Sequence, residues 1–371
     1  MRLTSIYILT GFAALVMFII TGCGESVPEP SSPDFDRAAL LTQWADQSVI
    51  PAYEAWSESA NQLASVTLEL VETPSAERVE EVRSAYREAY LSWQRVAMFD
   101  FGPASDRALL ATTNTFPVDT LGVLEDMSAE EWLPGTPSSL SRMGLPALDF
   151  LLFSKDTESL VMELSGGDAL YGQHLLRLTG HMATEGADIL GEWNGGYRDA
   201  FVASTGTEMG SSLGAVLNAF NRTYEGGLRK QKLGLPAGIS TFSQTPLPGH
   251  VEAPFAGDMS VDLIQEAFSA YRNLYNGVSA YGDGNLGLDD YLRSLGDTEF
   301  GQQLDADIQT QLNATEAALN QLESPLSEYV VNQQQEAFEV YAELQALVVL
   351  WKVDMMSALG VLVTYQDNDG D

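Results

Sequence analysis

Hydrophobic side chains spaced three and four residues apart recur along most of the chain, and this spacing predicts α-helices. The first helix should begin after Asp36, whose side chain can cap it, and Pro51 should kink it. The second should carry Pro74 at its first helical position, where a missing N–H costs nothing. No stretch alternates apolar and polar residues between hairpin turns, so we predict an all-α fold. Further helices are expected over residues 168–195, 211–229, 260–275, 300–322 and 325–359.

Two short sequences occur twice, which indicates a chain with two related halves. SAYREAY at residues 84–90 returns as SAYRNLY at 269–275, with five of seven positions identical. RMGLP at 142–146 returns as KLGLP at 232–236, so a cation precedes Gly-Leu-Pro by two residues in both. We predict two tandem helical-bundle-like halves, about 37–200 and 201–371, packed around a shared junction. Chance similarity between helical sequences is the alternative.

The N-terminus has the features of a signal peptide. Arg2 precedes an apolar run over residues 6–20, which is short for a membrane span, and ITGC ends it at residues 20–23. The last four residues resemble a bacterial lipobox, in which the cysteine is lipidated and the chain is cut before it. We predict a lipoprotein signal peptide at 1–22, then a lipidated Cys23 and a flexible tether at 23–36. The alternative is an uncleaved membrane anchor.

The residue after Cys23 bears on where the protein is sorted. It is Gly24 rather than an aspartate. By resemblance to lipoprotein sorting in Gram-negative bacteria, this predicts an exported lipoprotein of such a bacterium, held on the periplasmic side of the outer membrane.

The charge balance narrows the possible partners. The chain has 18 Lys and Arg against 52 Asp and Glu, a formal net charge of -34 at pH 7. Nucleic acid is excluded as a partner, because a phosphate backbone requires a basic surface. The hydrophobic content of 45% argues against intrinsic disorder. One cysteine excludes an intrachain disulfide, and three histidines leave little for an imidazole-rich metal site, so oxygen would have to hold any metal.

The most informative stretch is GLPALDFLLF at residues 144–153. Pro146 suits a first helical position, which puts Asp149 at the end of the first turn, near the positive end of the helix dipole. Such a carboxylate should stay ionised and could face a ligand. The alternative is that Asp149 only stabilises the start of its helix. The Pro- and Gly-rich segment 234–258 follows later, and a loop of that length is usually functional or mobile.

Residues 144–153 resemble the signature of the imelysin family, GxHxxE followed by an aromatic-Leu-Leu run. Other segments resemble the same family in order: 93–103 with its Phe-Gly-Pro, FPVD at 116–119, KLGLP at 232–236 and LGVLV at 359–363. The resemblance implies an all-α fold of two halves with a site at their junction. The family is classed with metallopeptidases, and relatives are periplasmic or surface components associated with iron uptake.

The sequence departs from that signature at two positions. Pro146 stands where the family has histidine, and Asp149 stands where it has glutamate. A proline side chain cannot ligate a metal, and no HExxH motif replaces it. His174 and His181 lie seven residues apart, about 10 Å along a helix, which is too far to share one ion easily. These departures weaken the expectation of a hydrolytic metal centre.

We therefore predict a lipid-anchored, non-enzymatic protein that binds a metal or small ligand, linked to iron uptake. Asp149 is the candidate metal ligand, for iron or another divalent cation held by oxygen. Membrane and iron-uptake components are the expected partners. The alternatives are a metallopeptidase of the family, a structural component of an outer-membrane complex, or a cluster that forms only structural ion pairs. The candidate ligand-binding residues are Asp119, Arg142, Asp149, Lys232 and Glu252.

Overall fold

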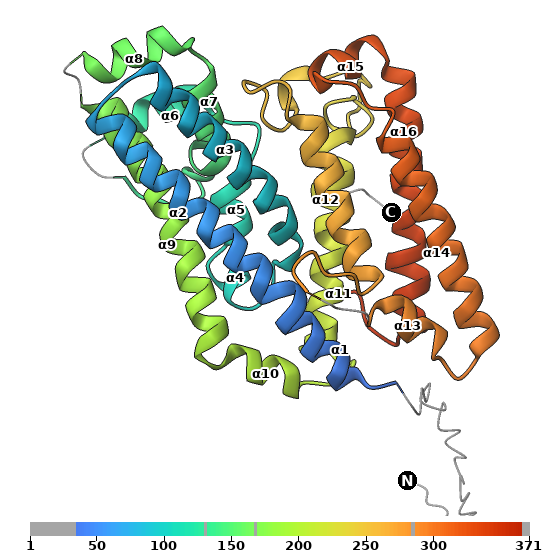
Figure 1. Cartoon of the computed structure of the whole chain (residues 1–371). Helices are drawn as coiled ribbons and strands as arrows, with labels where there is room; N and C mark the ends of the chain where they lie inside the picture. The colour runs from blue at the N-terminus through green and yellow to red at the C-terminus, as the bar shows by residue number, and fades with distance from the viewer. Residues whose placement is uncertain (1–34, 130–131, 167–168, 283–285, 366–371) are drawn as a thin grey trace, which may run out of the picture. The chain divides into compact units, whose positions relative to one another are not determined.

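The computed structural model describes residues 35–129, 132–166, 169–282 and 286–365, and every regular element among them is a helix (Figure 1). This confirms the all-α prediction. The predicted signal peptide, Cys23 and the acidic end at 367–371 lie outside the described residues. Within the described ranges, no helix combines the length and apolar composition needed to cross a membrane.

The chain folds into α-helices joined by shorter 3-10 and π-helical segments, which carry the label η. Up to residue 203 the elements are α1 (Arg37–Gln43), η1 (Trp44–Val49), α2 (Ile50–Glu72), α3 (Ala76–Val96), η2 (Ala97–Phe99), α4 (Pro103–Asp106), α5 (Leu109–Asn114), α6 (Thr120–Met127), η3 (Leu140–Arg142), α7 (Gly144–Phe153), α8 (Thr157–Ser165), α9 (Leu170–Glu192), η4 (Trp193–Tyr197) and α10 (Arg198–Ala203). From residue 212 they are α11 (Ser212–Arg222), η5 (Thr223–Gly234), η6 (Pro248–His250), α12 (Ser260–Tyr275), α13 (Leu288–Arg293), α14 (Thr298–Leu319), α15 (Leu326–Asn332), α16 (Gln334–Val348), η7 (Val349–Met355) and α17 (Met356–Ala358).

The first helical stretch runs from α1 through η1 into α2. Asp36 caps it as predicted, because its side chain accepts a hydrogen bond from the Ala39 N–H at 2.9 Å. Pro51 lies in the first turn of α2, directly after the π-helical turn η1. Such turns are one way in which a helix accommodates a local break in its hydrogen bonding. The helix therefore continues past Pro51 as far as Glu72.

The N-terminal helices pack around α2, which lies along both α3 and α9 (Figure 1). α7 packs against α3 and α9, so the signature segment is inside this group. Trp56 of α2 and Trp93 of α3 meet in the core with ring centroids 5.2 Å apart. The start of α3 differs from the prediction: Ser75 is its N-cap and accepts from the Arg78 N–H, so Pro74 lies outside the helix.

The C-terminal helices pack around a second aromatic core. α14 lies against α16, while η5 contacts both α11 and α16. Trp351 of η7 is completely buried, with the rings of Phe220 and Tyr224 at 4.7 and 4.8 Å. The single helix predicted over 325–359 is interrupted at Gln333, whose φ of -131° and ψ of 47° are not helical.

The repeated heptapeptide lies where the two groups meet, because one copy is on α3, the other is on α12, and these helices contact each other. Tyr86 and Tyr90 of the first copy are buried, as are Tyr271 and Tyr275 of the second. The described residues form one compact unit. The predicted boundary of the two halves near residue 200 stays a prediction.

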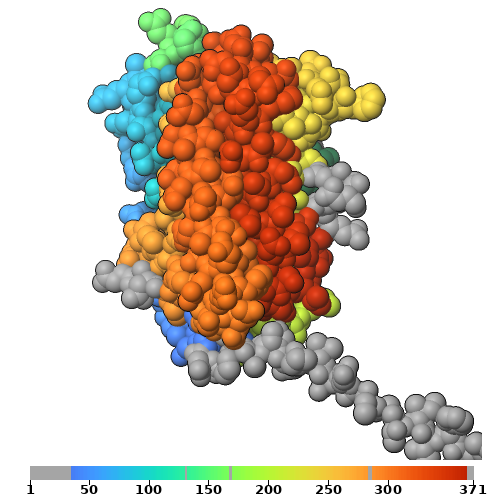
Figure 2. Space-filling model, turned by 90° about the vertical axis from the view of Figure 1, so that its right-hand side faces the viewer, coloured from blue at the N-terminus to red at the C-terminus, as the bar shows by residue number. Residues whose placement is uncertain are grey.

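The long segment between η5 and α12 has two different parts. Near residue 240 it projects at the edge of the face that α14 and α16 cover (yellow in Figure 2), and Phe242 there is fully exposed. Further along the chain, Val251, Glu252 and Ala253 are each only 1% exposed. The second part is therefore a component of the core and brings a carboxylate into it.

Candidate functional site

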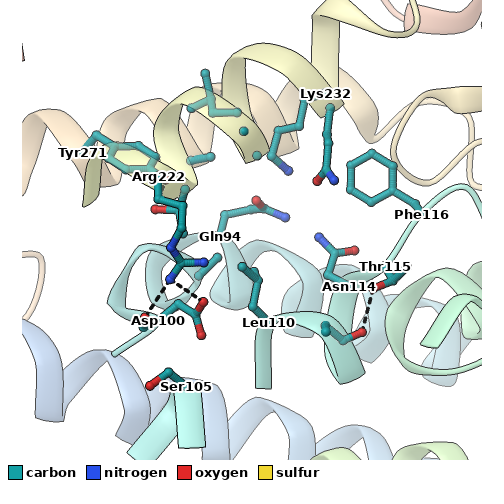
Figure 3. A pocket seen from close by; sticks show the side chains of 18 of the residues that line it. Gln94, Asp100, Ser105, Leu110, Asn114, Thr115, Phe116, Arg222, Lys232 and Tyr271 are labelled. Carbon is teal, nitrogen blue, oxygen red and sulfur yellow. Dashed lines mark hydrogen bonds and ion pairs between the residues drawn. The ribbon is translucent and has the colours of Figure 1, made fainter. Parts of the chain in front are cut away.

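A cavity of about 590 Å³ lies between the two groups of helices (Figure 3). One wall comes from the end of α3, η2 and the short helices α4 and α5, and the other comes from the end of α11, η5 and α12. A volume of this size accommodates a small molecule. The charged residues that line it are Asp100, Arg222 and Lys232.

One end of the cavity is formed by an ion pair between Arg222 and Asp100. Nη2 of Arg222 donates to the Asp100 carboxylate at 2.8 Å and to its backbone carbonyl at 3.0 Å. The arginine side chain is 40% exposed and the aspartate 10%. Nε and Nη1 of Arg222 have no hydrogen-bond partner among the described residues. The guanidinium therefore keeps N–H groups that a ligand could use.

The other end is formed by Lys232, whose ammonium donates to the carboxylate of Glu252. Both side chains are buried, at 7% and 1% exposure. Burial lowers the pKa of Lys232, and the adjacent Glu252 carboxylate opposes that shift. The ring of Phe116 lies 5.9 Å from the ammonium nitrogen. An ammonium has three N–H donors, and one is engaged by Glu252.

Two amide side chains position Glu252 from the opposite wall. Its Oε1 accepts from Gln94 Nε2 at 3.2 Å and from Asn114 Nδ2 at 2.6 Å. Tyr90 in turn donates its hydroxyl to Asn114 Oδ1 at 2.7 Å. Burial raises the pKa of Tyr90 well above its usual value, which keeps that hydroxyl a donor. Glu252 therefore connects α3 and α5 to η5, and its hydrogen-bonding capacity is largely used.

The cavity exists partly because η5 carries no side chain at two adjacent positions. Gly226 and Gly227 line the cavity, and a Cβ added to either would meet no atom within 4 Å. η5 is π-helical over its whole length, and π-helical segments occur frequently at functional sites. The Gly-Gly pair between Arg222 and Lys232 leaves open space between the two cations.

Asp149 lies behind this site rather than in its lining. α7 begins at Gly144, two residues before Pro146, so Asp149 is in the second turn and not at the end of the first. Its carboxylate is completely buried and accepts from the backbone N–H groups of Phe255 and Ala256, at 2.9 and 2.8 Å. These hydrogen bonds hold the segment 252–256, which carries Glu252, against α7.

The ionisation of Asp149 also differs from the expectation. Burial raises its pKa to about 7, although the two N–H groups act in the opposite direction. The carboxyl is therefore partly protonated at neutral pH instead of fully ionised. Desolvation outweighs the helix-dipole effect that the sequence pattern predicted, because the side chain has no access to water.

Asp119 and Arg142 form a separate cluster at α6. Asp119 caps α6 by accepting from the Gly122 N–H at 3.0 Å, and Arg142 Nε donates to its other oxygen at 3.1 Å. Arg142 also pairs with Asp126 at 3.4 Å. The structure thus brings Lys232 and Glu252 together and links Asp149 to them through the segment 252–256. Asp119 and Arg142 are not among the residues that line the cavity.

The sequence interpretation missed four residues of the site. They come from separate elements, and the residue types are common in helical proteins. One local signal was present, namely a Gly-Gly pair flanked by two cations ten residues apart. Among the described residues, no three or more His, Cys, Asp or Glu side chains lie together as a metal site would need. The missed residues are Gln94, Asp100, Asn114 and Arg222.

The fold and the cavity define an all-α protein with a ligand-sized cavity at the contact between two groups of helices. The chain belongs to the Imelysin family (peptidase M75), which matches residues 49–352.

Relatives in sequence and structure agree with this assignment. The chain is 25% identical over 306 residues to iron-regulated protein A of Synechococcus elongatus, covering 78% of this chain and 79% of that protein. An imelysin-like protein from Psychrobacter arcticum has a similar fold, with a TM-score of 0.70, 20% identity and coverage of 90% and 99%. A putative iron-regulated protein A precursor from Parabacteroides distasonis gives a TM-score of 0.68 at 16% identity, with coverage of 91% and 97%.

Proposed function

We propose that this chain is a non-enzymatic, iron-linked binding protein whose cavity takes a small carboxylate-bearing ligand. The observation that carries the proposal is the pair of cations, Arg222 and Lys232, with unused N–H donors at the edge of a cavity of about 590 Å³. Charge-assisted hydrogen bonds from such donors are the usual means of recognising carboxylates. The link to iron is supported by the name of the Synechococcus relative, an iron-regulated protein.

The groups available favour an iron complex over a bare iron ion. Hard cations need several oxygen ligands, whereas Asp100 is the one carboxylate among the lining residues described, and it is paired with Arg222. Glu252 already accepts from Lys232, Gln94 and Asn114, and Asp149 accepts from two backbone N–H groups. Iron would thus arrive with its own oxygen ligands, as in a ferric complex of an organic acid. Direct metal binding by Asp149 stays a prediction that the same titration tests.

The test is calorimetric titration of the mature protein with ferric citrate, citrate alone and ferrous sulfate, with bound metal measured after dialysis. Gly227→Leu fills the cavity without a backbone clash, and Gly180→Leu on α9 is its matched control, since a Cβ there also meets nothing within 4 Å. We expect ferric citrate to bind the wild-type protein and the Gly180 variant but not the Gly227 variant. Binding that survives in Gly227→Leu, or no binding at all, would contradict the proposal.

The two alternatives predict other results. Chelator-sensitive cleavage of a peptide library would support a metallopeptidase, and the family description names a peptidase. A structural component of an outer-membrane complex would bind none of the small molecules and would instead be recovered with a stable protein partner. Iron-uptake components remain the partners that we expect, and co-purification from iron-starved cells tests this.

We also propose that the chain is exported and held on the periplasmic side of the outer membrane by lipid on Cys23. The support is the N-terminal sequence alone, with its short apolar run and the ITGC at residues 20–23. Cys23→Ser should release the protein from the membrane fraction into the soluble periplasm. An unchanged membrane fraction would favour the uncleaved anchor.

A further inference from the structure

We infer that the cavity recognises both ends of one elongated dicarboxylate, with one carboxylate at Arg222 and the other at Lys232. The inference rests on the proposed function and narrows its ligand class. It follows from where the charges of the lining lie. The charged groups are confined to two places, and Figure 3 shows Arg222 and Lys232 well apart, with the side chain of Gln94 between them. A ligand with a single charged group would use only one of these places.

At the first end, Arg222 can receive a carboxylate without losing its protein partner. Asp100 is held by Nη2 alone, through its carboxylate and its backbone carbonyl. Nε and Nη1 remain, and a guanidinium presents its donors in a planar fork that suits carboxylates. Its exposure of 40% places this end at the mouth, where a ligand can enter without unfolding the helix.

At the second end, the ammonium of Lys232 is a compact charge that is more buried than the guanidinium of Arg222. The ammonium is 7% exposed and donates to Glu252, and its remaining N–H groups have no hydrogen-bond partner in the described part of the chain. The amides of Gln94 and Asn114 stand nearby and can add neutral donors. A carboxylate placed at this end would share the ammonium with Glu252, and these donors would reduce the repulsion between the two anions.

The distance between the two ends sets the ligand's length. Arg222 and Lys232 are ten residues apart on one continuous helix, so their backbones are separated by at most about 15 Å. The wall between them includes Leu110, Ala111 and Leu228, along with the bare backbone of the Gly-Gly pair. A hydrocarbon spacer suits this apolar part of the lining, and the amide of Gln94 can serve a polar group on it. The ligand class is therefore an organic acid with two separated carboxylates, free or as part of an iron complex.

The experiment compares succinate, adipate, suberate and sebacate with hexanoate, octanoate and decanoate by calorimetry on the mature protein. We expect one of the longer dicarboxylates to bind at least about tenfold more tightly than the monocarboxylate of its length, the usual effect of one added charge-assisted contact. Arg222→Gln should abolish this preference and leave monocarboxylate binding at the Lys232 end. The double variant Lys232→Met with Glu252→Gln should also abolish the preference for dicarboxylates, because it removes the cation at the other end of the cavity.

The possible failures are distinguishable. Equal affinities for dicarboxylates and monocarboxylates, with both lost in Gly227→Leu, would overturn the two-ended inference and leave the proposed function standing. A dicarboxylate preference that persists in Arg222→Gln would overturn it as well. Failure of ferric citrate and of every carboxylate to bind would instead contradict the proposed function itself. Thermal unfolding of each variant shows whether it is folded, and Gly180→Leu should match the wild-type protein throughout.

Discussion

The two Gly-Leu-Pro segments each follow a cation, an arginine in one and a lysine in the other, and the two cations lie in different environments. Arg142 precedes the first segment, is 27% exposed and is surrounded by the three carboxylates of Asp119, Glu125 and Asp126. Lys232 precedes the second, is 7% exposed and has a single acidic partner, Glu252, which is itself buried. The sequence pattern is shared, but burial determines what each cation can do.

The energetic consequences differ accordingly. A partly exposed arginine with three carboxylates around it gains little from any one of them, because solvent screens each pair. A buried lysine with one partner depends on that partner, since losing either leaves an uncompensated charge in the core. Lys232 also lines the cavity, with N–H donors that no other described residue uses. An equivalent motif can therefore stabilise the start of one helix and line the candidate site on another.

The largest effect is expected from Lys232→Met, which leaves the Glu252 carboxylate buried without its cation. We predict a loss of about 3–5 kcal/mol in the free energy of unfolding, measured by urea denaturation. The double variant with Glu252→Gln should recover much of this loss, because the glutamine is neutral and Gln94 and Asn114 can still donate to its carbonyl oxygen. Equal destabilisation by the single and double variants would show that the unpaired Glu252 carboxylate does not cause the loss of stability.

The second-largest effect is expected in the pH dependence of stability, through Asp149, which hydrogen-bonds the segment that carries Glu252. Burial raises the pKa of Asp149 to about 7, so the folded protein holds this proton more tightly than the unfolded chain, where an aspartate titrates near 4. Its contribution to stability is therefore full below about pH 4 and is lost as the pH rises towards 7. Relative to Asp149→Asn, the wild-type protein should lose about 2–4 kcal/mol across that range.

Urea unfolding of both proteins at several pH values measures this difference. The asparagine keeps one acceptor for the N–H groups of Phe255 and Ala256. The comparison therefore removes the ionisable carboxyl while retaining part of the hydrogen bonding to this segment. A difference between the two proteins that does not change with pH would mean that the pKa of Asp149 is close to that of an exposed aspartate.

The local parts of this architecture were predictable from the sequence. The Asp36 cap and the bounds of α12 follow from short-range patterns of polar and apolar residues, and the structure agrees with both. The Gln333 break between α15 and α16 was missed, because no Gly or Pro at that position signals a helix end. The short helices α4 and α5, which build one wall of the cavity, are below the length at which periodicity is informative.

The site was only partly predictable for a different reason. Lys232 and Glu252 were found because they lie beside a motif and in an unusual loop. Arg222 and Asp100 were missed because they are 122 positions apart, and only the packing of α11 and η5 against η2 brings them together. Asp149 was placed at an ionised helix start, whereas its environment is set by a loop more than a hundred residues later. Burial is a tertiary property that one sequence does not reveal.

The smallest effect, and the most direct check of the comparison, is expected from Arg142→Met. We predict a loss of no more than about 1 kcal/mol, several-fold below that of Lys232→Met, because the arginine is partly exposed and two of its carboxylates, Asp119 and Glu125, are exposed to solvent. Asp119→Ala serves as the matched control. It should cost about 1 kcal/mol through loss of the α6 cap at Gly122, and this cost should persist in high salt, since the Asp119 side chain also caps through a hydrogen bond. A loss of 3 kcal/mol or more in Arg142→Met, on the order of that expected for a buried pair, would show that the two cations are energetically alike and that burial does not separate them.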